Sequence, residues 1–237
     1  MYCDNAPRLS REQIERARLL GVAELCDGVK AAGVHLPNDG CMDAGICPTA
    51  RGMRFVGTAL TVETSGGDNF PIHMAAYRPG SEGYALVIDG KGCTERAYLG
   101  DLIMAACHAV GYEAIVLDGC SRDRDGNIGL GFPVYSRGFL PRGPVKKEPG
   151  SLNTPIQCGG VRVCPGDLVA GDSDGVCVIP RNLVDTVLNE AEKKLRYEAN
   201  RRLAIEEYRQ AKAAGAQLPQ LAPQWVLDLQ AEMAKEN

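Results

Sequence analysis

Two short apolar runs near the middle of the chain predict buried strands. They cover Tyr84–Ile88 and Ala114–Leu117, and an Asp-Gly pair follows each run. Short runs that contain β-branched residues and are bounded by turn residues are typical of buried strands. Between them, apolar residues repeat at helical spacing from Gly100 to Gly111, and a glycine suits the end of a helix. The pattern predicts a βαβ unit with two parallel strands.

The segments on either side of this unit also alternate between helical and strand patterns. We expect an N-terminal helix over about residues 10–32, opened by a capping box of Ser10 and Gln13. A strand at Phe55–Val62 and a short helix at about Phe70–Tyr77 follow. After the βαβ unit, apolar runs separated by Gly, Pro and Asp predict a β meander that closes against it. These runs are Pro133–Ser136, Thr154–Cys158, Gly160–Cys164, Asp167–Ala170 and Gly175–Ile179.

The last part of the chain is predicted to be helical. A long helix is expected from about residue 182 to 214, followed by a tail or a short extra helix that contains Trp225. Two Asp-rich pieces, Asp123–Asn127 and Asp172–Gly175, resemble calcium loops. Neither has the glycine and terminal glutamate of an EF-hand loop, so we expect both to be turns.

Composition limits the classes of function. The chain has 237 residues, a net charge of −4 and a sequence pI near 5.5. No basic stripe is available to displace counterions from nucleic acid, so we expect no nucleic-acid partner. We also expect no membrane segment, because no apolar run approaches membrane length, and no secretion signal, because the N-terminus lacks an apolar core. The expected location is cytoplasmic.

Cysteine, histidine and lysine offer weaker candidates for chemistry. The ten cysteines are scattered without a C-x2-C pair, and the three histidines do not have metal-ligand spacing, which argues against zinc. Cys120 lies beside the βαβ unit but has no neighbouring base that would make it a nucleophile. Lys91 is a candidate for a Schiff base, but a lysine in a Gly-rich turn is usually solvated.

Charged residues gather where the βαβ unit should present its ligand-binding edge. Asp101 lies at the predicted helix start, and Arg122 and Asp123 come just after the second strand. Because parallel strands end on the same edge, these side chains should converge there, beside backbone N–H groups that suit an anion. This inventory suits a metal-assisted reaction on a small carboxylic acid. Geometry alone leaves open a simpler interpretation, a surface turn whose Arg122 and Asp123 form an ordinary solvated ion pair.

Several ordered motifs resemble one known family. Gly100–Ile103 followed by Asp118–Asp123, and Pro165–Val176 followed by Ile179 and Pro180, are similar to signatures of the RraA-like family. That family includes the class II 4-hydroxy-4-methyl-2-oxoglutarate (4-carboxy-4-hydroxy-2-oxoadipate) aldolases and the regulator of ribonuclease activity A. The resemblance runs from roughly Val22 to Tyr197. It implies an α/β class with a swivelling β/β/α fold over residues 1–197, a helical extension over 198–237, and a homotrimer or homohexamer.

The resemblance also assigns roles to particular residues. The aldolases share Asp-x20-Arg-Asp, and Asp101, Arg122 and Asp123 fit that spacing, whereas regulator-type members lack the first Asp. By this resemblance Asp123 binds a divalent cation, Mg²⁺ or Mn²⁺, and Arg122 holds the pyruvoyl group. The loop of Gly100, Asp101, Leu102 and Ile103 supplies backbone donors to the substrate. On chemical grounds, Asp101 would orient a metal-bound water for proton transfer.

The implied activity is metal-dependent cleavage of a 4-hydroxy-2-oxo acid to pyruvate and a second oxo acid. Oxaloacetate decarboxylation passes through the same enolate and is an expected side activity. Two alternatives stay open: a non-catalytic protein-binding regulator, and a lyase of the same mechanism that acts on another oxo acid. The extension after Tyr197 and the Cys120-Ser121 pair depart from the family pattern and leave the substrate open.

Overall fold

The structure is a computed structural model that describes residues 1–235. They form two units, Met1–Ala191 and a second that begins at Glu192, so the boundary falls within a long helix. Residues 236 and 237 of the predicted extension lie outside the described residues. Among the described helices, none combines the length and apolar character needed to cross a membrane.

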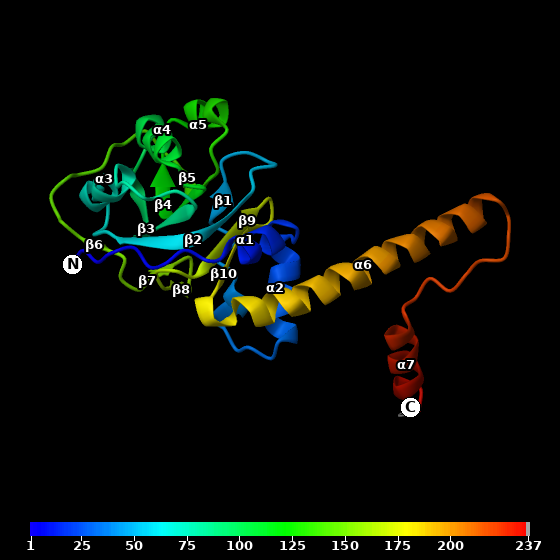
Figure 1. The fold of residues 1–237 in the computed structure, drawn as a ribbon. Coiled ribbons are helices and arrows are strands. Elements are labelled where there is room, and N and C mark those ends of the chain that lie inside the picture. The colour runs from blue at the N-terminus through cyan, green and yellow to red at the C-terminus, as the bar shows by residue number, and fades with distance from the viewer. Residues whose placement is uncertain (236–237) are drawn as a thin grey trace. The chain divides into compact units, whose positions relative to one another are not determined.

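One mixed sheet organises the first unit (Figure 1). Its strands run in the order β1-β5-β4-β3-β2-β9-β10, and β6 pairs with β2. Neighbours from β2 to β5 are parallel, whereas β1, β6, β9 and β10 pair antiparallel. The strands are β1 (Cys47–Pro48), β2 (Phe55–Glu63), β3 (Tyr84–Ala97), β4 (Ala114–Ser121), β5 (Val134–Phe139), β6 (Ser151–Leu152), β9 (Leu168–Asp172) and β10 (Gly175–Ile179).

Three helices connect the parallel strands and cover one face of the sheet (Figure 1). They are α3 (Phe70–Ala76), α4 (Asp101–Val110) and α5 (Arg124–Leu130). Because strand side chains alternate between faces, Leu86 and Ile88 of β3 pack against Met104 of α4 in one core cluster. The predicted βαβ unit is confirmed, and Gly111 ends α4 with a left-handed φ of 97°.

The opposite face has its own core and a different cover. Val87 of β3 and Val116 of β4 pack there with Val163, which lies in the hairpin of β7 (Ile156–Cys158) and β8 (Val161–Val163). The predicted meander is therefore wrong in part. The run at Pro133–Ser136 belongs to β5, which extends the parallel sheet, and only the later runs form antiparallel pairs. The prediction missed that α5 forms another crossover between β4 and β5.

The N-terminal helix was predicted as one piece and is two. Helix α1 spans Arg11–Arg18 and α2 spans Val22–Ala31. The capping box is confirmed, because Ser10 Oγ accepts from the Gln13 N–H and Gln13 Oε1 accepts from the Ser10 N–H, both at 3.1 Å. The break is stabilised from outside the segment: the Arg54 guanidinium donates to the Arg18 and Leu20 carbonyls, and Asp172 Oδ2 accepts from the Val22 N–H at 2.9 Å.

The sequence indicated that the two Asp-Gly pairs end their strands, and this prediction is wrong. Strands β3 and β4 continue through them to Ala97 and Ser121, with register shifts along the way. Asp89 and Asp118 are buried within the strands and have specific partners. Asp89 accepts from the Lys91 ammonium at 2.7 Å, and Asp118 accepts from Arg137 and from the Gly159 N–H.

The two Asp-rich pieces have different structures. Asp172–Gly175 is the predicted turn, which joins β9 to β10. Asp123–Asn127 is instead the start of α5, with Asp123 as the residue before the helix. Asp123 takes a left-handed conformation, with φ 58° and ψ 45°, at the turn between the end of β4 and the start of α5.

The long C-terminal helix is confirmed. Helix α6 spans Val184–Ala213 after a short 3₁₀ turn, η2 (Arg181–Leu183), and its first turns are buried in the first unit. In the second unit, α7 (Gln224–Met233) is the extra helix that the sequence left open. The Trp225 indole N–H lies 3.4 Å from the Tyr197 hydroxyl, and Arg201 donates to the Leu221 carbonyl at 2.6 Å, so the segment folds back on α6.

Candidate active site

The three residues singled out by their spacing come together at one end of the parallel sheet. Asp101 is the first residue of α4, and Arg122 and Asp123 directly follow β4. Asp123 Oδ2 lies 3.4 Å from both the Asp101 N–H nitrogen and Arg122 Nε. The Arg122 and Asp123 side chains are 45% and 41% exposed, so both can reach a ligand. The convergence expected from the βαβ geometry is confirmed.

Two glycines allow this close approach. A Cβ on Gly100 would lie against Asp123 Oδ2 and 3.0 Å from Arg122 Nε. A Cβ on Gly126 would lie 3.0 Å from Asp101 Cβ. The site therefore depends on the absence of side chains where the start of α4 meets the start of α5.

The backbone donors at the start of α4 already hold carboxylate oxygens. The Leu102 N–H donates to Asp101 Oδ1 at 2.8 Å, and the Asp101 N–H points to Asp123 Oδ2. The N–H of Ile103 bonds the Gly100 carbonyl within the helix turn. A helix N-terminus favours negative charge, and here two protein carboxylates occupy that position. A substrate carboxylate that uses these donors would replace one of them.

A cavity of about 190 Å³ lies beside these residues. One wall consists of Arg122, Asp123 and Gly100–Ile103, the loop to which the resemblance assigns substrate binding. The other wall was missed: it comes from α3 and from the loop before β6, through Asn69, His73, Tyr77 and Lys146. A larger hollow of about 830 Å³, lined in part by Leu36 and Pro180, borders none of the sequence-predicted site residues.

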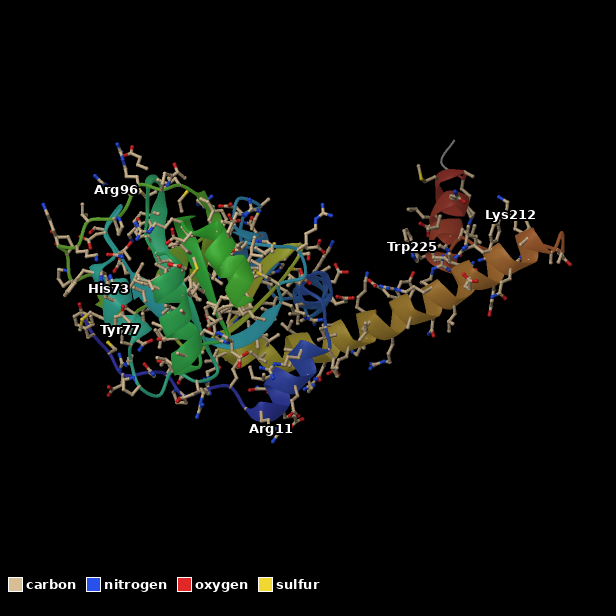
Figure 2. All side chains as sticks on the ribbon, turned by 90° about the horizontal axis from the view of Figure 1, so that it is seen from above. Arg11, His73, Tyr77, Arg96, Lys212 and Trp225 are labelled. Carbon is tan, nitrogen blue, oxygen red and sulfur yellow. The ribbon has the colours of Figure 1, made fainter. Side chains whose placement is uncertain are left out.

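The α3 wall is a row of polar groups one helical turn apart. Asn69 Nδ2 lies 3.4 Å from His73 Nε2, and His73 Nδ1 lies 3.3 Å from the Tyr77 hydroxyl. His73 lies on α3 and Tyr77 directly follows it, and Figure 2 labels both residues. Burial, together with the positive charge of Lys146, lowers the pKa of His73 below its usual value. The imidazole is therefore neutral at pH 7 and can donate or accept a hydrogen bond.

This row could have been found in the sequence. Asn69, His73 and Tyr77 are spaced by four residues across a segment that was correctly predicted to be helical, so they share one face. The histidine had been weighed only as a metal ligand. Lys146 carries no comparable signal, because it lies in a loop that only the folded structure brings near.

Asp68 fixes this wall in place. Its side chain is 1% exposed, and Oδ1 accepts from the Phe70 N–H at the start of α3. Oδ2 accepts from the N–H groups of Lys147 at 2.8 Å and Glu148 at 3.0 Å. Burial raises the pKa of Asp68, but these three backbone donors outweigh it and hold the pKa below the usual range. One carboxylate thus joins α3 to the loop that carries Lys146.

Comparison with known proteins places the chain in a family. A family model described as RraA-like, Aldolase/RraA, matches residues 22–178. A relative from Halalkalibacterium halodurans, named "Putative 4-hydroxy-4-methyl-2-oxoglutarate aldolase", is 39% identical over 160 residues, 68% of this chain and 76% of that protein. The chain belongs to the Aldolase/RraA family.

Solved structures of family members share the fold. Streptomyces coelicolor RraAS2, described as an unusual member of the RNase ES inhibitor RraA protein family, superposes with a TM-score of 0.74 and 25% identity, covering 83% of this chain and 98% of that chain. The RNA-processing inhibitor RraA from Thermus thermophilis gives 0.55 and 23% identity over 59% of this chain and 84% of that chain, which shows the fold alone. The predicted RraA-like α/β fold with a long C-terminal helix is confirmed.

The donor set of this Aldolase/RraA chain fits a weakly chelated divalent cation. Within residues 1–235, no group of three or more His, Cys, Asp or Glu side chains is arranged to hold a metal. Mg²⁺ keeps most of its waters and needs only one or two protein carboxylates. Asp123 meets that need, because its carboxylate is partly exposed and its contacts to Arg122 and the Asp101 N–H are long. Asn69 adds a buried oxygen, Oδ1, that has no hydrogen-bond partner and belongs to a residue lining the same cavity.

The surroundings of Lys91 and Cys120 disfavour both as catalytic groups. Lys91 bridges Glu63 and Asp89 at 2.9 and 2.7 Å. Burial lowers its pKa, but these two carboxylates outweigh burial and raise it, which disfavours a Schiff base. Cys120 is 5% exposed, and burial raises the pKa of its thiol, which disfavours a nucleophile.

Proposed function

We propose that this chain is a lyase that cleaves a 4-hydroxy-2-oxo acid of the 4-hydroxy-4-methyl-2-oxoglutarate type to pyruvate and a second oxo acid, with a divalent cation as cofactor. The observation that supports this most is the meeting of Asp101, Arg122 and Asp123 at one side of a small cavity. The name of the Halalkalibacterium halodurans relative agrees with it.

Each residue has a distinct task in this reaction. Breaking the bond between C3 and the hydroxyl-bearing C4 leaves an enolate, with negative charge on the 2-oxo oxygen of the pyruvate fragment. The Arg122 guanidinium donates to that oxygen or to the neighbouring carboxylate. Asp101, through a water, takes the proton of the 4-hydroxyl and returns it to the pyruvate methyl carbon. A divalent cation held by Asp123 would supply Lewis-acid stabilisation of the same negative charge.

The wall formed by α3 suits the far end of such a substrate. Lys146 provides a positive charge beside the polar side chains of His73 and Tyr77. An oxo acid with a second carboxylate would place that group against this wall, opposite Arg122. A lyase of the same mechanism on another oxo acid would use the same machinery, so a panel of 4-hydroxy-2-oxo acids that differ in the distal group identifies the substrate. Oxaloacetate belongs in the panel, since its decarboxylation needs the same charge stabilisation.

The proposal is tested by metal removal. Dialysis against EDTA should abolish pyruvate release, and Mg²⁺ or Mn²⁺ should restore it, because Asp123 is the only carboxylate expected to ligate the ion directly. Full activity in EDTA, or inactivation by borohydride in the presence of pyruvate, would point to a Schiff-base mechanism and contradict the proposal.

A second candidate function is a non-catalytic regulator that binds another protein. The description of Streptomyces coelicolor RraAS2 as a member of an RNase inhibitor family favours it. A chain that releases no pyruvate from any member of the panel, with Mg²⁺ present, would favour this candidate. We also propose that the chain forms a homotrimer or homohexamer. Size-exclusion chromatography with light scattering would distinguish these assemblies from a monomer.

A further inference from the structure

Helix α7 carries large apolar side chains that stay exposed in the single chain. Trp225 and Leu229 lie four residues apart on one face of the helix and are 61% and 49% exposed. Leu221, just before the helix, is 39% exposed. The indole N–H of Trp225 lies 3.4 Å from the Tyr197 hydroxyl, but the residue remains mostly open to solvent. Neighbouring apolar side chains on a surface mark a site that another molecule covers.

The second unit has no core that could take up these side chains. None of residues 192–235 is buried, whereas the first unit contains two hydrophobic core clusters. A ten-residue helix such as α7 gains little stability by itself and depends on the packing of its apolar face. The apolar face of α7 is therefore expected to be covered from outside the single chain.

The first unit carries an apolar groove that suits such a face. Its volume is about 830 Å³, and it shares no lining residue with the cavity beside Arg122. The apolar lining comes from separate segments and includes Leu36, Val161, Val178 and Pro180. Val161 and Val178 belong to β8 and β10 and to a core cluster, so the fold itself shapes the groove. Amphipathic helices bind hydrophobic grooves through apolar residues at helical spacing.

The charged residues of the groove present positive charge to a partner. Arg162 and Arg181 line the groove, and both are exposed. Asp167 lines it too, but this residue is 6% exposed. Its carboxylate already accepts from the N–H groups of Cys164 and Arg181, at 2.8 and 3.0 Å. The charge that an incoming side chain meets is therefore that of the two guanidinium groups.

Two carboxylates accompany the apolar residues on α7. Asp228 and Glu232 are three and seven residues after Trp225, and positions i, i+3, i+4 and i+7 share one face of a helix. Both side chains are exposed, and Asp228 also accepts from the Gln224 amide at 2.9 Å. A helix that places Trp225 and Leu229 in the groove therefore brings negative charge to its two arginines.

We propose that α7 of one copy of this chain binds the apolar groove of a second copy. Trp225 and Leu229 enter the apolar part of the groove. Asp228 and Glu232 pair with the two arginines that line it. The single chain leaves the helix face exposed, and the same sequence supplies a groove that matches it in apolar character and in charge. The contact joins two different surfaces, so it can close into a ring of copies. It does not depend on the lyase proposal.

The test uses the fluorescence of Trp225, which is the only tryptophan in the sequence. Burial of an indole moves its emission to shorter wavelengths. Arg162→Glu keeps the tryptophan but repels the carboxylates of α7, so it should emit at longer wavelengths than wild type. Trp225→Phe emits no tryptophan fluorescence and keeps an intact groove. When the two variants are refolded together from urea, the emission of the Arg162→Glu chain should return to shorter wavelengths, because its α7 can enter the groove of the other chain.

Two further variants complete the design. Glu232→Arg in the Arg162→Glu chain exchanges the charges and should restore the wild-type emission. Arg51→Glu is the matched control and should emit like wild type, because Arg51 is exposed in the turn before β2 and does not line the groove.

Three results would overturn the proposal. Equal emission of Arg162→Glu and wild type would show that α7 does not use this groove. A refolded mixture that emits like the separately refolded variants would show that a second copy does not supply the groove, which then has another occupant. A wild-type emission that is already at short wavelengths where sedimentation shows only monomers would place the docking within one chain.

Discussion

Replacing Asp68 with asparagine should loosen the wall of the cavity formed by α3 and destabilise the fold. The carboxylate accepts three backbone hydrogen bonds, from Phe70, Lys147 and Glu148, and its side chain is 1% exposed. In its better orientation, the amide keeps its oxygen toward Lys147 and Glu148 and turns its NH₂ toward the Phe70 N–H. One charge-assisted hydrogen bond is lost, and the other two become neutral hydrogen bonds. A charge-assisted hydrogen bond contributes about 1.5–3 kcal/mol to stability, and a neutral one about 0.5–1.5 kcal/mol. The expected loss is about 3–5 kcal/mol of unfolding free energy.

Urea denaturation followed by circular dichroism would measure this loss. Asp174→Asn is the matched control, because Asp174 is exposed in the turn between β9 and β10, and its substitution should change stability by less than about 0.5 kcal/mol. If the lyase proposal holds, KM should rise more than kcat falls, because the loop that carries Lys146 loses its anchor. Equal stability of Asp68→Asn and wild type would show that the three hydrogen bonds make no net contribution to the free energy of unfolding.

The same pair of proteins makes a pH prediction. The folded pKa of Asp68 is depressed, so its contribution is fully present above the unfolded pKa, about 3.9, and is lost as pH falls through the lower folded value. The stability gap between wild type and Asp68→Asn should therefore be constant from pH 7 to about 5 and narrow below about 4. A gap that stays constant down to the acid transition would contradict the assignment of the stabilisation to the charged form.

Three further predictions concern the wall of the cavity that contains Gly100, Asp101 and Arg122. Arg122→Ala should lower kcat by about 10²–10³, and Arg122→Lys should recover little, because an ammonium lacks the bidentate fork; a change in KM alone would show uniform binding instead. Asp101→Asn should keep its melting temperature while turnover falls about 10²–10⁴, and unchanged turnover would reduce Asp101 to a helix-start residue. Gly100→Ala should cost about 10² in turnover by displacing the neighbouring guanidinium and carboxylate, whereas Gly129→Ala, which meets no atom within 4 Å, should be active.

The sequence was most informative where topology leaves little choice. Parallel strands joined by a helix must end on the same edge, so Asp101 and Arg122 could be brought together across twenty intervening residues without coordinates. The resemblance to the family, and not topology, assigned backbone donors to Gly100–Ile103, which line the same cavity as Arg122. The motifs that resemble the family then indicated the lyase reaction that we propose. The family itself is confirmed by the match over residues 22–178.

Local signals failed where the deciding partner was far away in the sequence. Asp89-Gly90 resembled a turn, and only the ion pair with Lys91 and the strand register show that β3 continues through it. The break between α1 and α2 depends on Arg54 and Asp172, which no pattern within residues 10–32 reveals. Lys146 reaches the cavity because the backbone beside it is held by Asp68, a contact across 79 residues.

The hydrogen bonds at the break between α1 and α2 predict when these two helices form during folding. With eight and ten residues, both helices are below the length at which isolated helices persist in water. Their facing ends are completed by Arg54, just before β2, and by Asp172, at the end of β9. A peptide of residues 10–32 should therefore be largely unstructured in solution. In the whole chain, the slowly exchanging amides of α1 and α2 should gain protection together with those of β2 and β9, as one cooperative unit.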